Sequence, residues 1–145
     1  EIYFSEIFQA KDKSKKGFDV IIGNPPYGAK FTDAEKKDLR ERYPETQFKI
    51  DSYSLFLLKS MKLLKSVCTC YYIIPNTLLD NYFEEKVIEK LLVKHRIVEI
   101  IDLHDSVFYA AVVHSMIFAF QNYQQEKYKI KFGGENKGTY FCTPK

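Results

Sequence analysis

The sequence predicts an α/β fold in which a parallel sheet carries crossover helices on its faces. Apolar, β-branched runs at 18–23, 67–74 and 97–103 predict buried strands. Helical patterns separate these runs, and the order strand, helix, strand, helix, strand is typical of right-handed crossovers in a parallel sheet. Because 46% of the residues are hydrophobic and the net charge is only +3, we expect one globular unit over 1–145.

The first strand is expected to end abruptly. Phe18–Gly23 runs directly into two prolines, which fix the backbone φ angle and lack the N–H that a strand would donate. Thr32 and Glu35 then form the pattern of a capping box. This box predicts the start of a mostly polar, peripheral helix that ends before Pro44.

A deeply packed helix is expected from Asp51 onward. Asp51 itself is interpreted as the N-cap of this helix rather than as a catalytic base. Apolar side chains follow it at the spacing of one helical face, at Tyr53, Phe56, Leu57, Met61 and Leu64. Such a wide apolar stripe predicts that the helix lies against the sheet.

The second half of the chain predicts one more helix and two further strands. Asn81 and Glu84 suggest a second capping box, which begins a helix after the strand that stops at Pro75. The runs 112–120 and 128–132 have no helix between them, so we expect antiparallel strands at one edge of the sheet. A turn is expected at 132–138, followed by a frayed end or the entry to a further domain.

Several classes of protein do not fit this sequence. No segment approaches the roughly 20 apolar residues that span a bilayer, and the start lacks the pattern of a secretory signal. The sequence therefore indicates no membrane protein. Cys68 and Cys70 are expected to be reduced core thiols of a cytoplasmic protein. No metal is expected, because His95, His104 and His114 show no ligand-like spacing.

The residues Asn24-Pro25-Pro26-Tyr27 are the strongest chemical signal. They follow the first strand directly, at the carboxyl end where open parallel sheets bind ligands. The prolines stiffen the loop and remove competing donors, so an asparagine oxygen and a proline carbonyl can accept both hydrogens of a planar amino group. Tyr27 can stack on the ring that bears the amine. The alternative is a proline-stiffened turn whose tyrosine packs in the core.

This segment resembles a known catalytic motif. Residues 18–28 are similar to the motif of the adenine-specific DNA methyltransferases of restriction-modification systems, in particular the TaqI-like and type IIG enzymes. Segments 51–56, 72–79 and 105–108 resemble the next motifs in the same order, so the resemblance covers about 18–121. It implies the later half of a Rossmann-like S-adenosylmethionine-dependent methyltransferase sheet.

The resemblance implies a role for each motif residue. Asn24 and the Pro25 carbonyl would hold the amine of a flipped adenine in double-stranded DNA. Tyr27 and Phe108 would stack on the base, while Asn24 and Pro26 would face the methyl donor, S-adenosylmethionine. Catalysis would rest on positioning for in-line methyl transfer, with no strong general base. For the second stacking ring, Tyr109 and a purely structural Phe108 remain alternatives.

The family resemblance also implies partners beyond this sequence. The glycine-rich donor-binding loop of the family lies upstream of its Asn-Pro-Pro-Tyr motif, and its DNA-recognition domain lies downstream. Because neither is found here, 1–145 is expected to be a partial catalytic domain of a prokaryotic protein, with an incomplete donor site and no activity alone. A fused or associated endonuclease is a further partner that the resemblance implies.

Two alternative functions remain open at this stage. Related motifs serve enzymes that methylate adenine in RNA or glutamine in proteins. A different class would be a non-catalytic DNA-binding or interaction module that keeps the fold and lacks the donor site.

Overall fold

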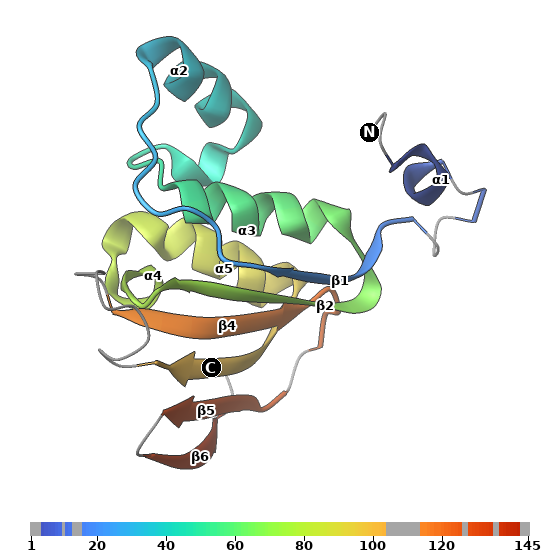
Figure 1. Cartoon of the computed structure of the whole chain (residues 1–145), viewed down its shortest axis with the longest axis vertical. Helices are drawn as coiled ribbons and strands as arrows, with labels where there is room; N and C mark the ends of the chain where they lie inside the picture. The colour runs from blue at the N-terminus through green and yellow to red at the C-terminus, as the bar shows by residue number, and fades with distance from the viewer. Residues whose placement is uncertain are drawn as a thin grey trace.

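The computed structural model describes residues 4–9, 11–12, 16–103, 114–125 and 128–134, together with the backbone of 137–142. These residues form a six-stranded mixed sheet with helices packed on one face (Figure 1). The predicted α/β class is therefore confirmed. In the described part of the chain, no helix is both long enough and apolar enough to cross a membrane.

The spatial order of the strands is β1-β2-β4-β3-β5-β6. β1 pairs in parallel with β2, and β3 pairs in parallel with β5, whereas β4 is antiparallel to both β2 and β3. The carboxyl ends of β1, β2, β3 and β5 consequently lie along one edge of the sheet. The strands are β1 (Phe18–Gly23), β2 (Leu64–Pro75), β3 (Arg96–Asp102), β4 (Ser115–Gln121), β5 (Ile130–Gly134) and β6 (Lys137–Cys142).

The last three strands correct the sequence-based expectation. β4, which was expected at an edge, lies inside the sheet, because the connection from β2 to β3 skips one position and β4 fills that gap. β5, which was expected to be antiparallel, runs parallel to its inner neighbour β3. β6, where a turn and a frayed end were expected, pairs with β5 and is the antiparallel strand at the edge.

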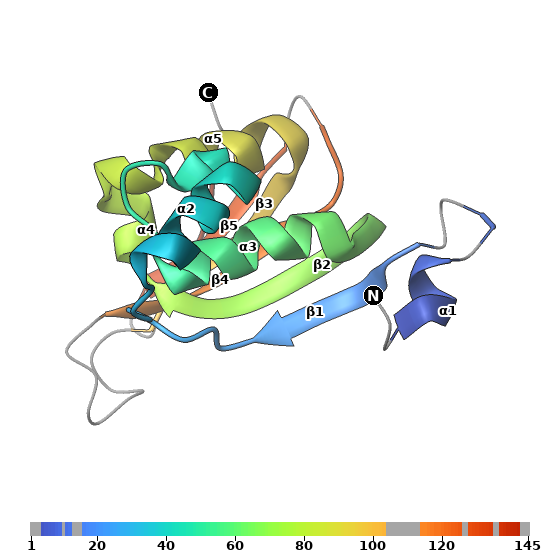
Figure 2. The ribbon, with the colours of Figure 1, turned by 90° about the horizontal axis from the view of Figure 1, so that it is seen from above.

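The main helices lie together on one face of the sheet. They are α2 (Asp33–Arg42), α3 (Ser52–Leu63) and α5 (Glu85–Lys94). Figure 2 shows α3 running above β2, while the short helix α1 (Ser5–Phe8) lies apart beyond the start of β1. Helices on both faces were expected. Two crossovers of the same hand that step in the same direction across the sheet place their helices on the same face instead.

Short elements complete the helical layer. A 3₁₀ turn, η3 (Pro44–Thr46), lies between α2 and α3. After β2 come one helical turn, α4 (Thr77–Asp80), and a second 3₁₀ turn, η4 (Tyr82–Glu84), which leads into α5.

The helix starts test the predicted caps. The capping box of α2 is confirmed, because Glu35 N–H donates to Thr32 Oγ1 over 3.3 Å and Thr32 N–H donates to the Glu35 carboxylate over 2.8 Å. Asp51 occupies the N-cap position of α3, but its side chain makes no capping bond and pairs with Lys49 at 2.9 Å. The second predicted box is wrong: the Asn81 side chain caps η4 by accepting from Phe83 N–H.

The core lies between α3, α5 and the sheet. Its fully buried side chains include Leu57, Leu58, Cys70, Ile74, Leu91, Phe118 and Phe120. Cys68 and Cys70 are free thiols, as the sequence predicted, and burial raises the pKa of the Cys70 thiol to about 12. On the opposite face of the sheet, Val20 and Ile22 of the edge strand β1 are 55% and 78% exposed.

Candidate active site

The Asn24–Tyr27 loop begins where β1 ends and is bounded by two glycines. Gly23 pairs with Tyr72 of β2, and a Cβ atom at position 23 would lie 3.0 Å from a Tyr72 ring carbon. Gly28 has a φ of +67°, a left-handed conformation that glycine adopts without strain. Gly23 therefore allows the chain to pass close to β2 as it leaves the sheet, and Gly28 allows the turn that follows Tyr27.

The structure brings Asn24 and Tyr27 together. The Tyr27 hydroxyl lies 3.2 Å from Asn24 Oδ1 and 3.1 Å from the Ile73 carbonyl oxygen of β2, and it can donate to either. Asn24 is exposed, whereas Tyr27 is half-buried against the core. An exposed carboxamide is thus held beside an aromatic ring at the carboxyl end of β1.

The two prolines have different surroundings. Pro25 is buried and Pro26 is exposed. The Pro26 carbonyl accepts a hydrogen bond of 2.5 Å from Ser52 Oγ, and the same oxygen of Ser52 accepts from Ala29 N–H at 3.4 Å. Ser52, the first residue of α3, therefore ties the loop at two points. Sequence reasoning missed this residue, although its position directly after the N-cap was a usable signal.

A second contact with α3 involves the Tyr27 ring. The Tyr53 ring meets it edge-on, with centroids 6.4 Å apart and planes at 89°. Tyr53 is only 3% exposed, and its hydroxyl donates to Glu84 Oε1 at 3.4 Å. Ser54 Oγ donates to the other carboxyl oxygen of Glu84 at 2.7 Å. Glu84, which the sequence suggested as a capping residue, is instead 1% exposed beneath the site.

The surroundings of Glu84 shift the pKa of its carboxyl above the ordinary value. Burial raises the pKa of this carboxyl, and the nearby Asp51 carboxylate raises it further. The hydrogen bond from Ser54 and the charge of Lys49 act in the opposite direction without cancelling the rise. Burial also raises the pKa of the Tyr53 phenol, so this hydroxyl stays a donor at neutral pH.

The raised pKa of Glu84 predicts a pH-dependent stability. Between the ordinary pKa of 4.5 and the raised pKa of the folded state, the folded protein holds a proton on Glu84 that the unfolded chain releases, so the stability that this group contributes is lost as pH rises through the folded pKa. Glu84→Gln does not titrate at this position. We therefore expect urea denaturation to show wild type losing stability relative to Glu84→Gln as the pH rises from 4.5 through the folded-state pKa of Glu84. A difference that is constant with pH would contradict this.

Phe108 belongs to a segment, residues 104–113, that lies outside the described residues. Tyr109, its competitor for the second stacking ring, lies in the same segment. The placement of either ring opposite Tyr27 therefore stays a prediction.

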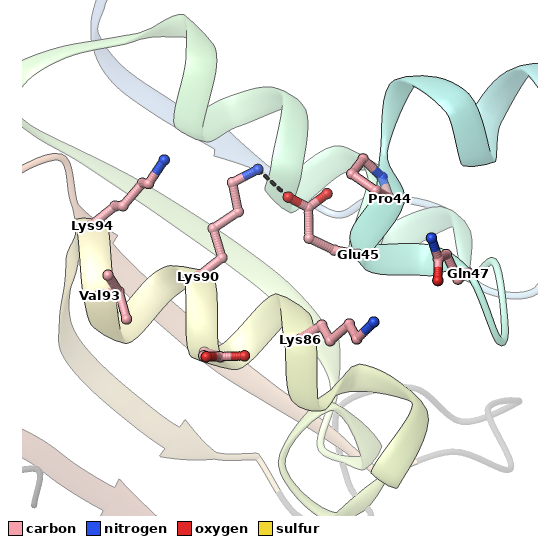
Figure 3. A pocket seen from close by; sticks show the side chains of 8 residues that line it. Pro44, Glu45, Gln47, Lys86, Lys90, Val93 and Lys94 are labelled. Atoms are coloured by element: carbon pink, nitrogen blue, oxygen red, sulfur yellow. Dashed lines mark hydrogen bonds and ion pairs between the residues drawn. The ribbon is translucent and has the colours of Figure 1, made fainter.

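A separate groove of about 400 Å³ lies between η3 and α5 (Figure 3). Lys90 forms an ion pair across it with Glu45. It is lined by Pro44, Glu45, Gln47, Lys86, Glu89, Lys90, Val93 and Lys94. None of the predicted site residues that the structure describes lines this groove, which therefore lies apart from the Asn24–Tyr27 loop.

Comparison with known proteins connects the loop to a family. The family model of the Eco57I restriction-modification methylase matches residues 1–108. The protein RM.MjaORFECS2P of Methanocaldococcus jannaschii, provisionally named a type II restriction enzyme and methyltransferase, is 35% identical over 104 residues. The type II methyltransferase M.AccI of Acinetobacter calcoaceticus is 34% identical over 116 residues.

These matches cover most of this chain and little of the relatives. They span 71% of this chain but 8% of RM.MjaORFECS2P, and 74% of this chain but 21% of M.AccI. A solved Listeria monocytogenes structure, provisionally named a class I S-adenosylmethionine-dependent methyltransferase, superposes with a TM-score of 0.68 at 16% identity. This superposition covers 83% of the present chain and 38% of the other. It shows that the two share a fold.

Proposed function

Because the chain belongs to the Eco57I restriction-modification methylase family, we propose that it supplies the catalytic loop of a DNA adenine methyltransferase that uses S-adenosylmethionine. The observation that carries this proposal is the contact between Asn24 and Tyr27 at the carboxyl end of β1. This contact places an amide acceptor beside an aromatic ring, and both features suit the amino group of a purine.

Asn24 and Pro25 act on the amino group. The Asn24 carboxamide oxygen and the Pro25 carbonyl accept the two N–H groups of the adenine amine. Accepting both hydrogens draws the nitrogen toward a tetrahedral geometry and localises the lone pair that is otherwise delocalised into the ring. The nitrogen then becomes a competent nucleophile, and its proton needs no strong base because the amine becomes acidic only once it is methylated.

Tyr27 acts on the base. An adenine in a duplex must leave the stack before its amine can react, at a cost of a few kcal/mol, and stacking on an aromatic side chain returns about 1 to 3 kcal/mol. The Tyr27 hydroxyl has two acceptors within reach, Asn24 Oδ1 and the Ile73 carbonyl. When the base arrives, the hydroxyl can donate to Ile73 alone and leave Asn24 Oδ1 to the amine.

Asn24 and Pro26 are the residues of this chain that would face the methyl donor. Both are exposed at the end of the edge strand β1, so a ligand can approach them from the side of the sheet that β1 leaves unpaired in the described residues. The donor supplies an electrophilic methyl group on sulfonium. The loop keeps the acceptor nitrogen in line with that group, which is catalysis by positioning.

We propose further that this chain works within a longer protein. The relatives extend far beyond the matched region, and RM.MjaORFECS2P combines a restriction enzyme and a methyltransferase in its name. The remaining donor contacts and a DNA-recognition domain would come from such additional regions. An endonuclease in the same protein or an associated one is a further partner that this proposal includes.

The nature of the acceptor tests the proposal. The complete protein, given S-adenosylmethionine with a labelled methyl group, is expected to label adenine-containing duplex DNA and not RNA or a glutamine-containing peptide. Labelling of RNA or of the peptide in place of DNA would overturn it. Absence of transfer to every acceptor, in a protein shown to bind DNA, would favour a non-catalytic module.

A further inference from the structure

The orientation of the Tyr27 ring is determined by hydrogen bonds at its hydroxyl and by a contact with a second ring. The hydroxyl can donate to Asn24 Oδ1 or to the Ile73 carbonyl, and this limits where the tip of the side chain can lie. Those bonds alone leave the ring free to rotate about its long axis. The edge-on contact with the Tyr53 ring, with planes at 89°, restricts this rotation.

Tyr53 itself is held by a residue from a distant part of the chain. Glu84 lies in η4, and its carboxyl accepts from Tyr53 at 3.4 Å and from Ser54 at 2.7 Å. Both tyrosine and glutamate are almost completely buried. A carboxyl that is buried to this degree needs its hydrogen bonds, because unpaired polar groups in a protein interior are costly. The pair therefore resists displacement of either partner.

We infer that Tyr53 is a positioning residue for the stacking face of Tyr27, and that Glu84 fixes Tyr53 in that role. The inference rests on the proposed function of Tyr27. Neither residue touches the base or the donor in this account. Together they set the plane of the Tyr27 ring before DNA binds, so that less conformational freedom is lost when the flipped adenine stacks.

Variants of Tyr53 in the complete protein test this inference. Tyr53→Leu removes the ring and is expected to lower kcat about tenfold while the KM for DNA changes little, because only alignment is lost. Tyr53→Phe keeps the ring and loses the bond to Glu84, so its kcat should lie between those of wild type and Tyr53→Leu. The matched control is Tyr128→Leu, which removes another buried tyrosine. The Tyr128 hydroxyl oxygen accepts from Ile97 N–H near the amino end of β3, whereas the Asn24–Tyr27 loop lies at the carboxyl end of β1. The control variant should lower the melting temperature and leave kcat near wild type.

Glu84 provides an independent second pair of variants. Glu84→Gln keeps the length and planar shape of the side chain and one acceptor oxygen for Tyr53 or Ser54, so it should lose less kcat than Glu84→Leu. Glu84→Leu leaves Ser54 and Tyr53 without their acceptor and should lower kcat at least as far as Tyr53→Phe does. Equal loss in Glu84→Gln and Glu84→Leu would overturn the role of this side chain in holding Tyr53.

A measurement that does not depend on methyl transfer separates the inference from the proposed function. With ¹³C-labelled tyrosine, the ring resonance of Tyr27, assigned by its loss in Tyr27→Phe, should shift in Tyr53→Leu and barely in Tyr128→Leu. If wild type methylates no DNA while the resonance shifts, the proposed function fails and the contact stands. If wild type is active but Tyr53→Leu keeps both kcat and the Tyr27 resonance, the positioning role is wrong.

Discussion

Asn24→Ala in the complete protein is expected to lower the rate of methyl transfer to adenine at least about a hundredfold, which corresponds to roughly 2.7 kcal/mol of transition-state stabilisation. Asn24 Oδ1 is the side-chain acceptor for the amine in this account, and alanine offers nothing in its place. Because the Asn24 side chain is exposed in a loop, the melting temperature should stay close to that of wild type. Single-turnover transfer of labelled methyl to a duplex measures the effect.

The control for this variant is another asparagine away from the loop. Asn122 donates through Nδ2 to the Leu64 carbonyl at the amino end of β2, so Asn122→Ala should affect stability and leave transfer unchanged. Transfer at the wild-type rate in Asn24→Ala would remove the proposed handling of the amine.

Tyr27 variants are expected to separate stacking from hydrogen bonding. Tyr27→Ala loses the ring and should lower kcat/KM about 10- to 100-fold, in line with the 1 to 3 kcal/mol of a base-stacking contact. Tyr27→Phe keeps the ring and loses only the bonds to Asn24 and Ile73, so a smaller loss of about fivefold is expected. The fluorescence of 2-aminopurine at the target position reports whether the base still leaves the stack.

Tyr43→Ala is the matched control for this series. Tyr43, which lies between α2 and η3, is half-buried like Tyr27. Its ring contacts Lys62 of α3, with 4.6 Å from Nζ to the ring centroid. Its loss should leave transfer and fluorescence unchanged. If Tyr27→Ala behaved in the same way, the adenine would not be stacked on Tyr27.

Much of this site could be predicted from local sequence. The end of β1 at Gly23 follows from the two prolines, and the start of α2 follows from Thr32 and Glu35. Such features depend on residues within a few positions of one another, so they can be read from the chain itself. The meeting of Asn24 and Tyr27 is likewise a contact between residues three apart.

Long-range features were not accessible in the same way. An apolar run such as Ser115–Gln121 carries no signal for its direction or its neighbours, so its place between β2 and β3 had to come from the structure. Glu84 was misread because Asn81 and Glu84 match a capping box locally, whereas its partners Tyr53 and Ser54 lie 31 and 30 residues away. The burial of a glutamate on such partners cannot be inferred from spacing.

The central claim is that the Asn24–Tyr27 loop presents the amino group of adenine for methylation. The most direct measurement is mass spectrometry of nucleosides from duplex DNA that has been incubated with the complete protein and S-adenosylmethionine. The account predicts N6-methyladenine as the product, present with wild type and lost with Asn24→Ala. A methyl group found on cytosine instead, or N6-methyladenine formed equally by Asn24→Ala, would contradict it.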